Sequence, residues 1–179
     1  MRIIAGSAKG RRLGRVPRGV RPVSDRAREG VFSSLGARVV DARCADLFAG
    51  TGAMGIEALS RGAASCVFVD SSSDAIRAIR DNLSRAGLAD GARVERDEVA
   101  RFVRRDPGEV DLAFLDPPYT FPEPDLRDIL DHLTPHLVTG ATVVLTRPRR
   151  AATDVIPVNL QVGKHLDYGD ARILVLEVP

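Results

Sequence analysis

The sequence predicts an α/β fold built on a mostly parallel sheet of seven strands. Two observations carry this prediction. Short apolar segments typical of strands alternate with amphipathic segments typical of helices over most of the chain, and a glycine-rich turn follows the first of these strands. Strands that alternate with helices form right-handed βαβ units, in which the strands are parallel. The 179 residues, of which 44% are hydrophobic, suffice for one globular domain with a sizeable core.

A short basic extension is predicted at the N-terminus. Two apolar segments, residues 2–5 and 12–16, flank a Gly/Ser/Lys/Gly turn and predict a small β-hairpin. A linker with two prolines follows the hairpin. We therefore divide the chain into an N-terminal hairpin arm, residues 1–22, and a main domain, residues 23–179.

The main domain is expected to begin with a helix. Ser24 is a typical N-cap, Gly36 is a typical end, and Val31, Phe32 and Leu35 form an apolar stripe between them. The strands that follow are expected at residues 43–48, 65–70, 92–97, 109–116 and 140–146. The glycine loop with its helix, and the later helices, are expected at residues 49–63, 71–88 (with Ser72 or Ser73 as its cap), 98–106 and 123–133.

The C-terminal part breaks the alternation. Residues 158–178 predict two strands joined by a turn at Gly169-Asp170, with no helix between them. Two strands joined by a tight turn are antiparallel. The sheet is therefore expected to carry an antiparallel pair at one side.

Positive charge is concentrated at the start of the chain. Residues 1–30 contain nine basic and two acidic side chains, a net charge of +7, so the rest of the chain carries −5 of the total of +2. A basic segment on an acidic body is typical of proteins that bind a polyanion. The candidate nucleic-acid-binding residues are Lys9, Arg11, Arg12, Arg21 and Arg26.

The cysteines and histidines indicate neither disulfides nor a metal site. Cys44 and Cys66 lie in apolar, strand-like segments, where buried free thiols of a reducing compartment are expected. The three histidines lack a spacing suited to zinc, which needs three or four ligands. The chain has no apolar run near the ~18 residues of a membrane span, and its start lacks the apolar middle of a signal peptide. We expect a cytoplasmic protein that binds neither metal nor membrane.

The glycine-rich turn predicts a nucleotide-like cofactor. Gly50-x-Gly52-x-x-Gly55 lies between a strand and a helix, and Asp70 ends the next strand twenty residues after Gly50. This pattern fits a dinucleotide, whose ribose hydroxyls an acid can hold. It also fits S-adenosylmethionine, which has the same ribose diol. Asp46, four residues before the first glycine, suits a cationic sulfonium and ammonium better than a pyrophosphate. A tight turn without a ligand is the structural alternative.

Two acids follow the third strand of the series. Either Asp97 or Glu98 could accept a hydrogen bond from an adenine amino group, and the next backbone N–H could meet a ring nitrogen. Acids at this place are also favoured by the dipole of the following helix. Both interpretations stay open, as does the choice between the two residues.

The fourth strand ends in the sequence Asp116-Pro117-Pro118-Tyr119. Neither proline can donate to a sheet, and both fix φ, so the turn is stiff. The carboxyl ends of parallel strands share one crevice, which places this turn beside the glycine loop. A carboxylate and a proline carbonyl that accept from an exocyclic amine would aim its lone pair at a sulfonium methyl group. Tyr119 would stack on a flipped-out base. A merely rigid loop is the alternative.

These motifs together resemble the Asp/Asn-Pro-Pro-Tyr class of S-adenosylmethionine-dependent amino-methyltransferases. Within that class the chain resembles the RsmD family, which methylates a guanine N2 in small-subunit ribosomal RNA. The resemblance rests on the segments "RIIAGSAKGRRL", "RPVSDRAREGVF", "DLFAGTGAMGIEALSRGA" and "FLDPPY".

The resemblance implies a Rossmann-like class I methyltransferase fold and a set of site residues. It implies that the N-terminal hairpin engages RNA. It implies catalysis at Asp116, Pro117, Pro118 and Tyr119. The cofactor contacts that it implies, with their neighbours as further candidates, are Asp46, Phe48, Gly50, Thr51, Gly52, Asp70, Ser71, Asp97 and Glu98.

The chain departs from the family pattern at four places. Val23 stands where the family usually has threonine, Ser33 where it has asparagine, and Glu98 where it has aspartate. The fifth strand is followed by "TRPRR" rather than an acidic ending, and its arginines could border an RNA groove or form a solvated loop. These departures concern substrate contacts more than the reaction class.

The predicted function is methyl transfer from S-adenosylmethionine to a guanine N2 of small-subunit ribosomal RNA, in line and onto a flipped base. The substrate would be the RNA alone or a particle that carries ribosomal proteins, and the enzyme a monomer. The main alternative is an amino-methyltransferase for adenine or cytosine of DNA or RNA, or for a protein amide. An NAD-dependent oxidoreductase and a non-catalytic RNA-binding module are further alternatives.

Overall fold

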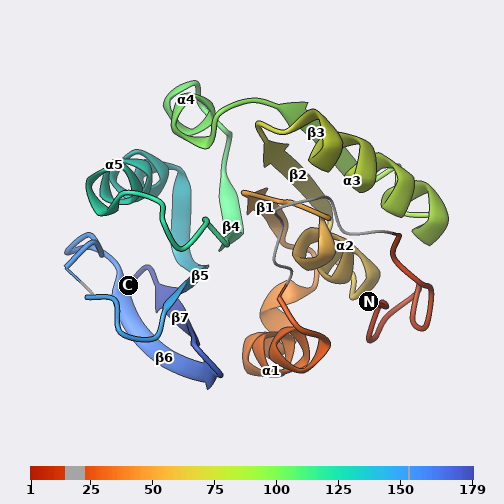
Figure 1. Cartoon of the computed structure of the whole chain (residues 1–179), viewed down its shortest axis with the longest axis horizontal. Coiled ribbons are helices and arrows are strands. Elements are labelled where there is room, and N and C mark those ends of the chain that lie inside the picture. Colours follow the sequence, from red (N-terminus) through yellow and green to blue (C-terminus); the bar gives the residue numbers. More distant parts are fainter. Residues whose placement is uncertain (15–22, 153) are drawn as a thin grey trace.

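The computed structural model describes residues 1–14, 23–152 and 154–179, which contain a seven-stranded sheet with helices on both faces (Figure 1). Its strands are β1 (Arg43–Leu47), β2 (Ser65–Asp70), β3 (Ala92–Arg96), β4 (Val110–Leu115), β5 (Leu137–Pro148), β6 (Gln161–Tyr168) and β7 (Ala171–Glu177). Its helices are α1 (Asp25–Leu35), α2 (Ala53–Ser60), α3 (Ser73–Ala86), α4 (Val99–Arg104) and α5 (Glu123–Leu133), with 3₁₀ turns η1 (Gly36–Val39) and η2 (Thr134–His136).

The order of the strands across the sheet is β3-β2-β1-β4-β5-β7-β6. Strands β1 to β5 are parallel, and β7 runs antiparallel to both β5 and β6. This confirms the predicted α/β sheet and its antiparallel side. The chain order reverses between β1 and β4, whose residues Asp46 and Phe114 pair across the switch point. Ligands of open α/β sheets bind outside the carboxyl ends of the strands at such a point.

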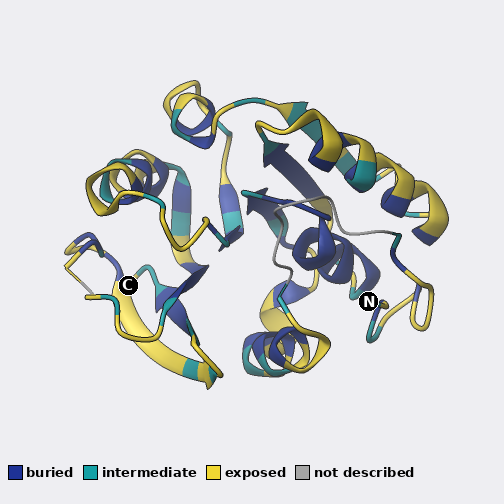
Figure 2. Ribbon diagram, in the orientation of Figure 1, coloured by how far each residue is buried: buried dark blue, intermediate teal, exposed yellow. Residues whose placement is uncertain are grey.

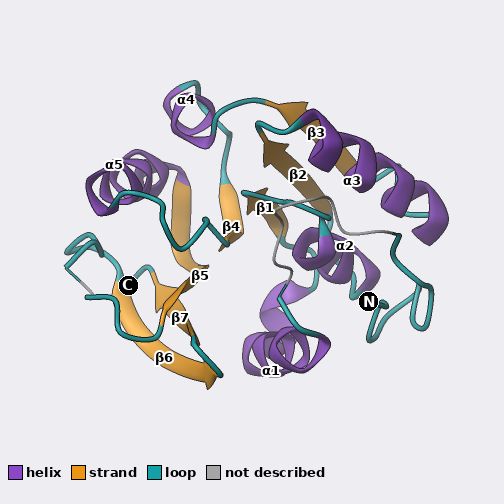
Figure 3. Cartoon of the chain, in the orientation of Figure 1, coloured by secondary structure: helices purple, strands orange, loops and turns teal. Residues whose placement is uncertain are grey.

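The core lies in two layers, one on each face of the sheet. Helices α1, α2 and α3 cover one face, and α4 and α5 cover the other (Figure 3). Side chains of neighbouring residues in a strand point to opposite faces, so Phe114 joins the first layer and Leu115 the second. The inner strands are buried, whereas the edge strand β6 is exposed along most of its length (Figure 2).

Local signals in the sequence account for the helix ends. The Ser24 hydroxyl accepts from the backbone N–H of Ala27 at 3.1 Å, and α1 ends at Gly36, as predicted. Between the two serines proposed as caps of α3, the structure selects Ser72, whose hydroxyl accepts from the N–H of Ala75. Capping side chains satisfy amides that lack a partner within the helix.

Two elements differ from the prediction. Strand β5 is longer than residues 140–146 at both ends, because Leu137 already pairs with Val110 of β4 and the pairing with β7 continues to Pro148. The N-terminal hairpin is shorter: Arg2 and Arg12 form a single antiparallel bridge, and the N–H of Ile3 donates to the carbonyl of Arg11 at 3.0 Å. Residues 1–14 otherwise form turns and loop (Figure 3), and the rest of the predicted second strand lies outside the described residues.

The N-terminal segment is fixed to the main domain by a buried carboxylate. Glu57 of α2 is 1% exposed and accepts from the backbone N–H groups of Ile4 and Ala5 at 2.8 and 3.0 Å. It also pairs with Arg61 at 2.7 Å and lies 3.7 Å from the guanidinium of Arg28. Arg28 is completely buried and donates to the carbonyl of Arg2. Arg28 is thus a structural cation, although it contributes to the positive count at the N-terminus.

The structure bears on the predictions about the cysteines, a metal site and a membrane span. Cys44 and Cys66 are buried free thiols, as predicted. Among the residues that the structure describes, no group of three or more His, Cys, Asp or Glu side chains could hold a metal ion. No helix in the described part of the chain has the length and apolar character needed to cross a membrane.

Candidate active site

The glycine loop joins β1 to α2 through backbone conformations that most side chains avoid. Phe48, Gly50 and Gly52 have φ values of 62°, 55° and 74°. Glycine adopts this left-handed region without strain, whereas Phe48 does so at a cost in conformational energy. Such strained residues persist where the surrounding structure holds them and cluster at functional sites.

The second and third glycines of the motif serve packing. A Cβ atom on Gly52 would lie 3.2 Å from Ile79, and one on Gly55 would lie 2.4 Å from the ring of Phe68 and 2.6 Å from the sulfur of Cys66. Gly55 therefore lets α2 lie directly on β2. This is the close approach of helix to strand for which the motif requires its last glycine.

Asp46 is a buried carboxylate on the wall of a cavity. It is 3% exposed, and one of its oxygens accepts from the backbone N–H of Gly55 at 2.8 Å. Its pKa is raised to about 8, chiefly by burial and to a smaller extent by the nearby carboxylates of Asp116 and Asp70, while the hydrogen bond from the Gly55 N–H acts in the opposite direction. A buried acid of this kind becomes favourably charged when a cation binds beside it.

Asp70 at the end of β2 is held by two backbone amides. One oxygen accepts from the N–H of Gly50 at 2.8 Å, and the other accepts from the N–H of Ser72 at 2.9 Å. The carboxylate therefore connects the glycine loop to the start of α3. Each carboxylate oxygen can accept more than one hydrogen bond, so Asp70 retains capacity for hydroxyl groups of a ligand.

These acids line a cavity of about 350 Å³ at the carboxyl ends of β1, β2 and β4. Pockets for small molecules have this order of size. Nine of the predicted site residues line it, namely Asp46, Phe48, Gly50, Thr51, Asp70, Ser71, Asp116, Pro118 and Tyr119. The sequence prediction did not include Val23, Ala49, Ala53 and Met54, which complete the wall.

The other predicted residues lie outside this cavity wall. Pro117 is buried, and Gly52 faces the packing contacts described above. The carboxylate of Asp97 is engaged by Arg105 at 2.5 Å and by the N–H of Glu98 at 2.9 Å. Glu98 precedes α4 with an exposed side chain and makes no side-chain capping bond. Of the two alternatives, Glu98 is thus the acid whose carboxylate is not used to anchor α4.

The Asp116–Tyr119 turn is held in place by contacts of the residues that follow it. The N–H of Phe121 donates to the carbonyl of Pro118 at 2.8 Å and closes the turn. The Phe121 ring meets the ring of Phe48 from the glycine loop, with their centroids 5.0 Å apart. Two residues after Phe121, Glu123 at the start of α5 forms an ion pair with the buried Arg147 of β5 at 2.5 Å.

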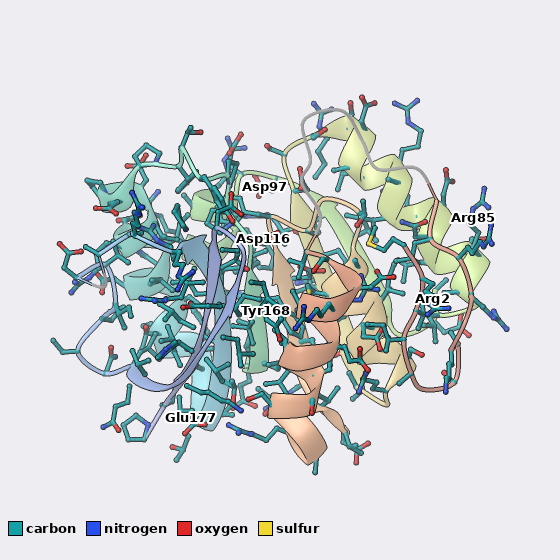
Figure 4. The ribbon with its side chains drawn as sticks, turned by 60° about the horizontal axis from the view of Figure 1, so that its bottom comes forward. Arg2, Arg85, Asp97, Asp116, Tyr168 and Glu177 are labelled. Carbon is teal, nitrogen blue, oxygen red and sulfur yellow. The ribbon has the colours of Figure 1, made fainter. Side chains whose placement is uncertain are left out.

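A second, smaller cavity of about 120 Å³ adjoins the first. Val23, Asp116 and Tyr119 line both cavities. The remaining wall comes from α1, the end of β5 and the β6–β7 turn, with Ser24, Ala27, Thr146, Tyr168, Asp170, Ala171 and Ile173. Figure 4 shows Asp116 and Tyr168 near α1 in the middle of the molecule. These wall residues carry no local signal in the sequence and were not predicted, because only long-range packing brings them together.

Tyr168 packs against α1 at Gly30, a residue without a side chain. A Cβ atom on Gly30 would lie 1.8 Å from the Tyr168 hydroxyl oxygen. Glycine at this position therefore allows the phenol to lie against the helix. A glycine within a helix is otherwise unfavourable by about 1 kcal/mol relative to alanine, and this apparent defect was the signal in the sequence that could have indicated a close contact.

Four of the five predicted nucleic-acid-binding residues lie in the described part of the chain, and none of these four lines either cavity. Lys9, Arg11, Arg12 and Arg26 are exposed, and Arg21 is outside the described residues. Arg11 donates to the carbonyl of Arg85 at 3.3 Å, near the C-terminal end of α3. Figure 4 places Arg2 and Arg85 together at one side of the molecule, away from Asp116. Arg11 therefore has a structural contact besides any role in binding.

Comparison with known proteins supports the sequence resemblance. A family model described as Conserved hypothetical protein 95 matches residues 1–177. The putative rRNA methyltransferase YlbH of Bacillus subtilis is 42% identical over 66% of this chain and 67% of its own length. The ribosomal RNA small subunit methyltransferase D of Escherichia coli K12 is 39% identical over 66% of this chain and 60% of its own length. The aligned region thus spans less than two thirds of the latter protein.

A solved structure agrees over nearly the whole chain. The putative methyltransferase yhhF from Escherichia coli superposes with a TM-score of 0.87 at 30% identity, covering 99% of this chain and 97% of that one. This confirms the predicted Rossmann-like methyltransferase fold. The chain belongs to the family described as Conserved hypothetical protein 95, which is the RsmD family that its motifs resemble.

Proposed function

We propose that this protein transfers a methyl group from S-adenosylmethionine to the exocyclic N2 of a guanine in small-subunit ribosomal RNA. One observation carries the proposal: Asp116 and Tyr119 line both a larger cavity suited to the cofactor and a smaller cavity suited to a base. A group at this boundary can touch the donor and the acceptor at once. The names of both relatives support ribosomal RNA as the substrate, and the name of the Escherichia coli relative supports the small subunit.

The residues of the larger cavity fit S-adenosylmethionine. Asp46 is a buried acid whose charged form a cationic ammonium group would stabilise. Asp70, held by two backbone amides, would accept from the ribose hydroxyls, and Glu98 would accept from the adenine amino group. A dinucleotide fits less well, because the acid at Asp46 would face a pyrophosphate. When bound, the cofactor supplies a methyl group on an electrophilic sulfonium.

The chain's own part in the chemistry is to prepare the amine. The N2 nitrogen of guanine is a poor nucleophile because its lone pair is delocalised into the ring. Asp116 and a proline carbonyl of the stiff turn would accept its two N–H groups and draw the nitrogen towards tetrahedral geometry. Preorganised acceptors of this kind need no rearrangement during the reaction. As the new C–N bond forms, the nitrogen releases one proton, for which Asp116 is the adjacent acceptor.

Tyr119 and the smaller cavity would hold the flipped base. Tyr119 is 39% exposed and stands between the two cavities, where its ring can stack on a base that has left its helix. We further propose that the enzyme acts in the cytoplasm as a monomer. Its substrate is the RNA alone or a particle that bears ribosomal proteins.

The proposal is tested by methyl transfer from labelled S-adenosylmethionine. The substrates are naked small-subunit ribosomal RNA and small-subunit particles, both from cells that lack the protein. Label recovered as N2-methylguanosine is the expected outcome, and the better substrate shows whether bound proteins shape the site. Label in another nucleoside keeps the amine chemistry and rejects guanine. If neither substrate is labelled although the cofactor binds, ribosomal RNA is rejected, and DNA and protein amides are tested next.

A further inference from the structure

A third cavity continues from the proposed base cavity towards the surface. It has a volume of about 810 Å³ and is lined by Tyr119, Pro148, Arg149, Arg150, Gly169, Asp170 and Arg172. Tyr119 and Asp170 line both this cavity and the smaller one beside Asp116. A nucleic-acid strand that leaves the proposed base cavity past Tyr119 would therefore enter a space with three arginines in its wall.

The pairing of β5 with β7 brings these arginines together. Pro148 at the end of β5 pairs with Ala171 at the start of β7, and the N–H of Arg149 donates to the carbonyl of Asp170 at 2.7 Å. Arg149 and Arg150 thus emerge beside Arg172 at the carboxyl edge of the sheet, which is the edge that carries the proposed active site. We call this cavity, with Arg149, Arg150 and Arg172, the arginine groove.

One carboxylate orders two of the three guanidinium groups. Asp167 of β6 accepts from Arg172 through both oxygens at 2.8 and 3.1 Å and lies 3.4 Å from the Nε of Arg149. This arrangement lowers the pKa of Asp167, chiefly through its hydrogen bonds with Arg172. Three cations face two acids, Asp167 and Asp170, so the groove keeps a net positive charge. Arg149 and Arg150 remain exposed.

We propose that the arginine groove binds the phosphodiester backbone of the RNA next to the flipped nucleotide. The inference rests on the proposed function for the position of the base, and extends it to the strand beside that base. A flipped base stays attached to its backbone, so a neighbouring phosphate must lie near the mouth of the base cavity. Planar guanidinium groups match the oxygen pairs of phosphate. An acidic peptide would satisfy the charge but has no reason to start at a stacking tyrosine.

The groove adds a second basic contact, separate from the N-terminal segment. Figure 1 shows the N-terminal segment beside α2 and α3 on one side of the sheet and the β6–β7 hairpin on the opposite side. The proposed active site lies between them, at the carboxyl ends of the central strands. RNA held at both places would span the site, with the reacting nucleotide over Asp116.

The test measures RNA binding without a methyl donor. The double variant Arg149→Ala/Arg150→Ala is compared with Arg38→Ala/Arg104→Ala, which removes the same charge. Arg38 and Arg104 are exposed as well, each forms an ion pair as Arg149 does, and they lie outside all three cavities. Binding of naked small-subunit ribosomal RNA is measured from about 0.05 to 0.3 M salt. Each lost phosphate contact lowers the slope of log K against log salt by about 0.7 for single-stranded RNA.

We expect the groove variant to bind roughly tenfold more weakly at about 0.2 M salt, with a slope lower by about 1.4. Arg149→Lys/Arg150→Lys should keep most of the slope, and the control pair should behave as wild type. Thermal unfolding checks that the variants fold. An unchanged slope in the groove variant, or an equal loss in the control pair, overturns the proposal. Because no methyl transfer is measured, an error in the assigned base leaves this test intact.

Discussion

The ring of Phe48 meets the ring of Phe121 edge-on, with centroids 5.0 Å apart and planes at 71°. Phe48 belongs to the glycine loop that lines the larger cavity, and Phe121 follows the Asp-Pro-Pro-Tyr turn. The contact therefore joins the two loops that the proposed reaction must align. It also explains how Phe48 keeps a φ of 62°, because a packed aromatic ring resists the relaxation of a strained backbone.

Replacing Phe121 should misalign the two loops. Phe121→Ala removes the edge contact and is expected to lower kcat ten- to a hundredfold, because small displacements of reacting groups are costly. The free energy of unfolding should fall by about 2 kcal/mol, since the ring is only half-buried. Phe121→Leu keeps most of the apolar volume and should lose less of both. Steady-state kinetics and urea unfolding measure the two effects, and an unchanged kcat in a destabilised Phe121→Ala would reject the alignment role.

Cofactor binding should release a proton from Asp46. The pKa of the buried acid is about 8 without ligand, so about nine tenths of it is protonated at pH 7. A bound ammonium group favours the ionised form, which lowers the pKa in the complex. Binding should therefore strengthen roughly ninefold from pH 6 to pH 7 and roughly fivefold from pH 7 to pH 8, and the contribution of Asp46 should level off near pH 9.

Calorimetry in buffers of different ionisation enthalpy measures this proton directly. At pH 7 we expect wild type to release close to one more proton than Asp46→Asn, which binds more weakly. The variant also corrects for titration of the ligand's own amino group, because that group is common to both measurements. Equal proton release in the two proteins would show that Asp46 does not ionise on binding.

Asp116 should be needed for turnover and not for cofactor binding. Asp116→Ala removes the acceptor of the reacting amine, and loss of one preorganised group of this kind typically costs about 10²–10³ in rate. The cofactor affinity should change little, because Asp46 and Asp70 would hold its charged and hydroxyl groups. Asp125→Ala, an exposed acid in the first turn of α5, removes the same charge outside the cavities and serves as the control. Single-turnover methyl transfer at wild-type rate in Asp116→Ala would contradict the assignment.

Local signals in the sequence were enough to predict most of the fold. Features that depend on long-range contacts could not be predicted in this way. Ser24 with Gly36, and the apolar periodicity of residues 123–133, predicted their helices correctly because capping and amphipathicity are local properties. The extension of β5 to Pro148 depends on its register with β7, which has no local signal.

The residues of the candidate site also fall into a predicted group with local sequence signals and a group that depends on long-range packing. The glycine loop, Asp70 and the Asp-Pro-Pro-Tyr turn were predicted because each motif is continuous in sequence and ends a strand. Thr146 and Tyr168 were missed, because they reach the cavity only when β5 and the β6–β7 hairpin pack beside α1. The positive count at the N-terminus was correct, but it could not show that Arg28 points inward to Glu57.

The basic residues of the N-terminal part should therefore separate into two groups. Lys9 and Arg12 are exposed, whereas Arg28 is buried beside Glu57 and Asp25. Lys9→Ala/Arg12→Ala should lower the salt slope of RNA binding by about 1.4 and leave the free energy of unfolding within about 0.5 kcal/mol of wild type.

Arg28→Ala should do the reverse. Removing one partner of a buried ion pair costs about 3–5 kcal/mol in general. The loss here should be nearer about 2–3 kcal/mol, because Glu57 keeps Arg61 and two backbone amides, and two guanidinium nitrogens of Arg28 have no hydrogen-bond partner in the described part of the chain. Urea unfolding gives the stability, and RNA titration under conditions where the variant is folded gives the slope. A lowered slope in folded Arg28→Ala would mean that this cation reaches the RNA, and that the N-terminal segment must leave Glu57 when RNA binds.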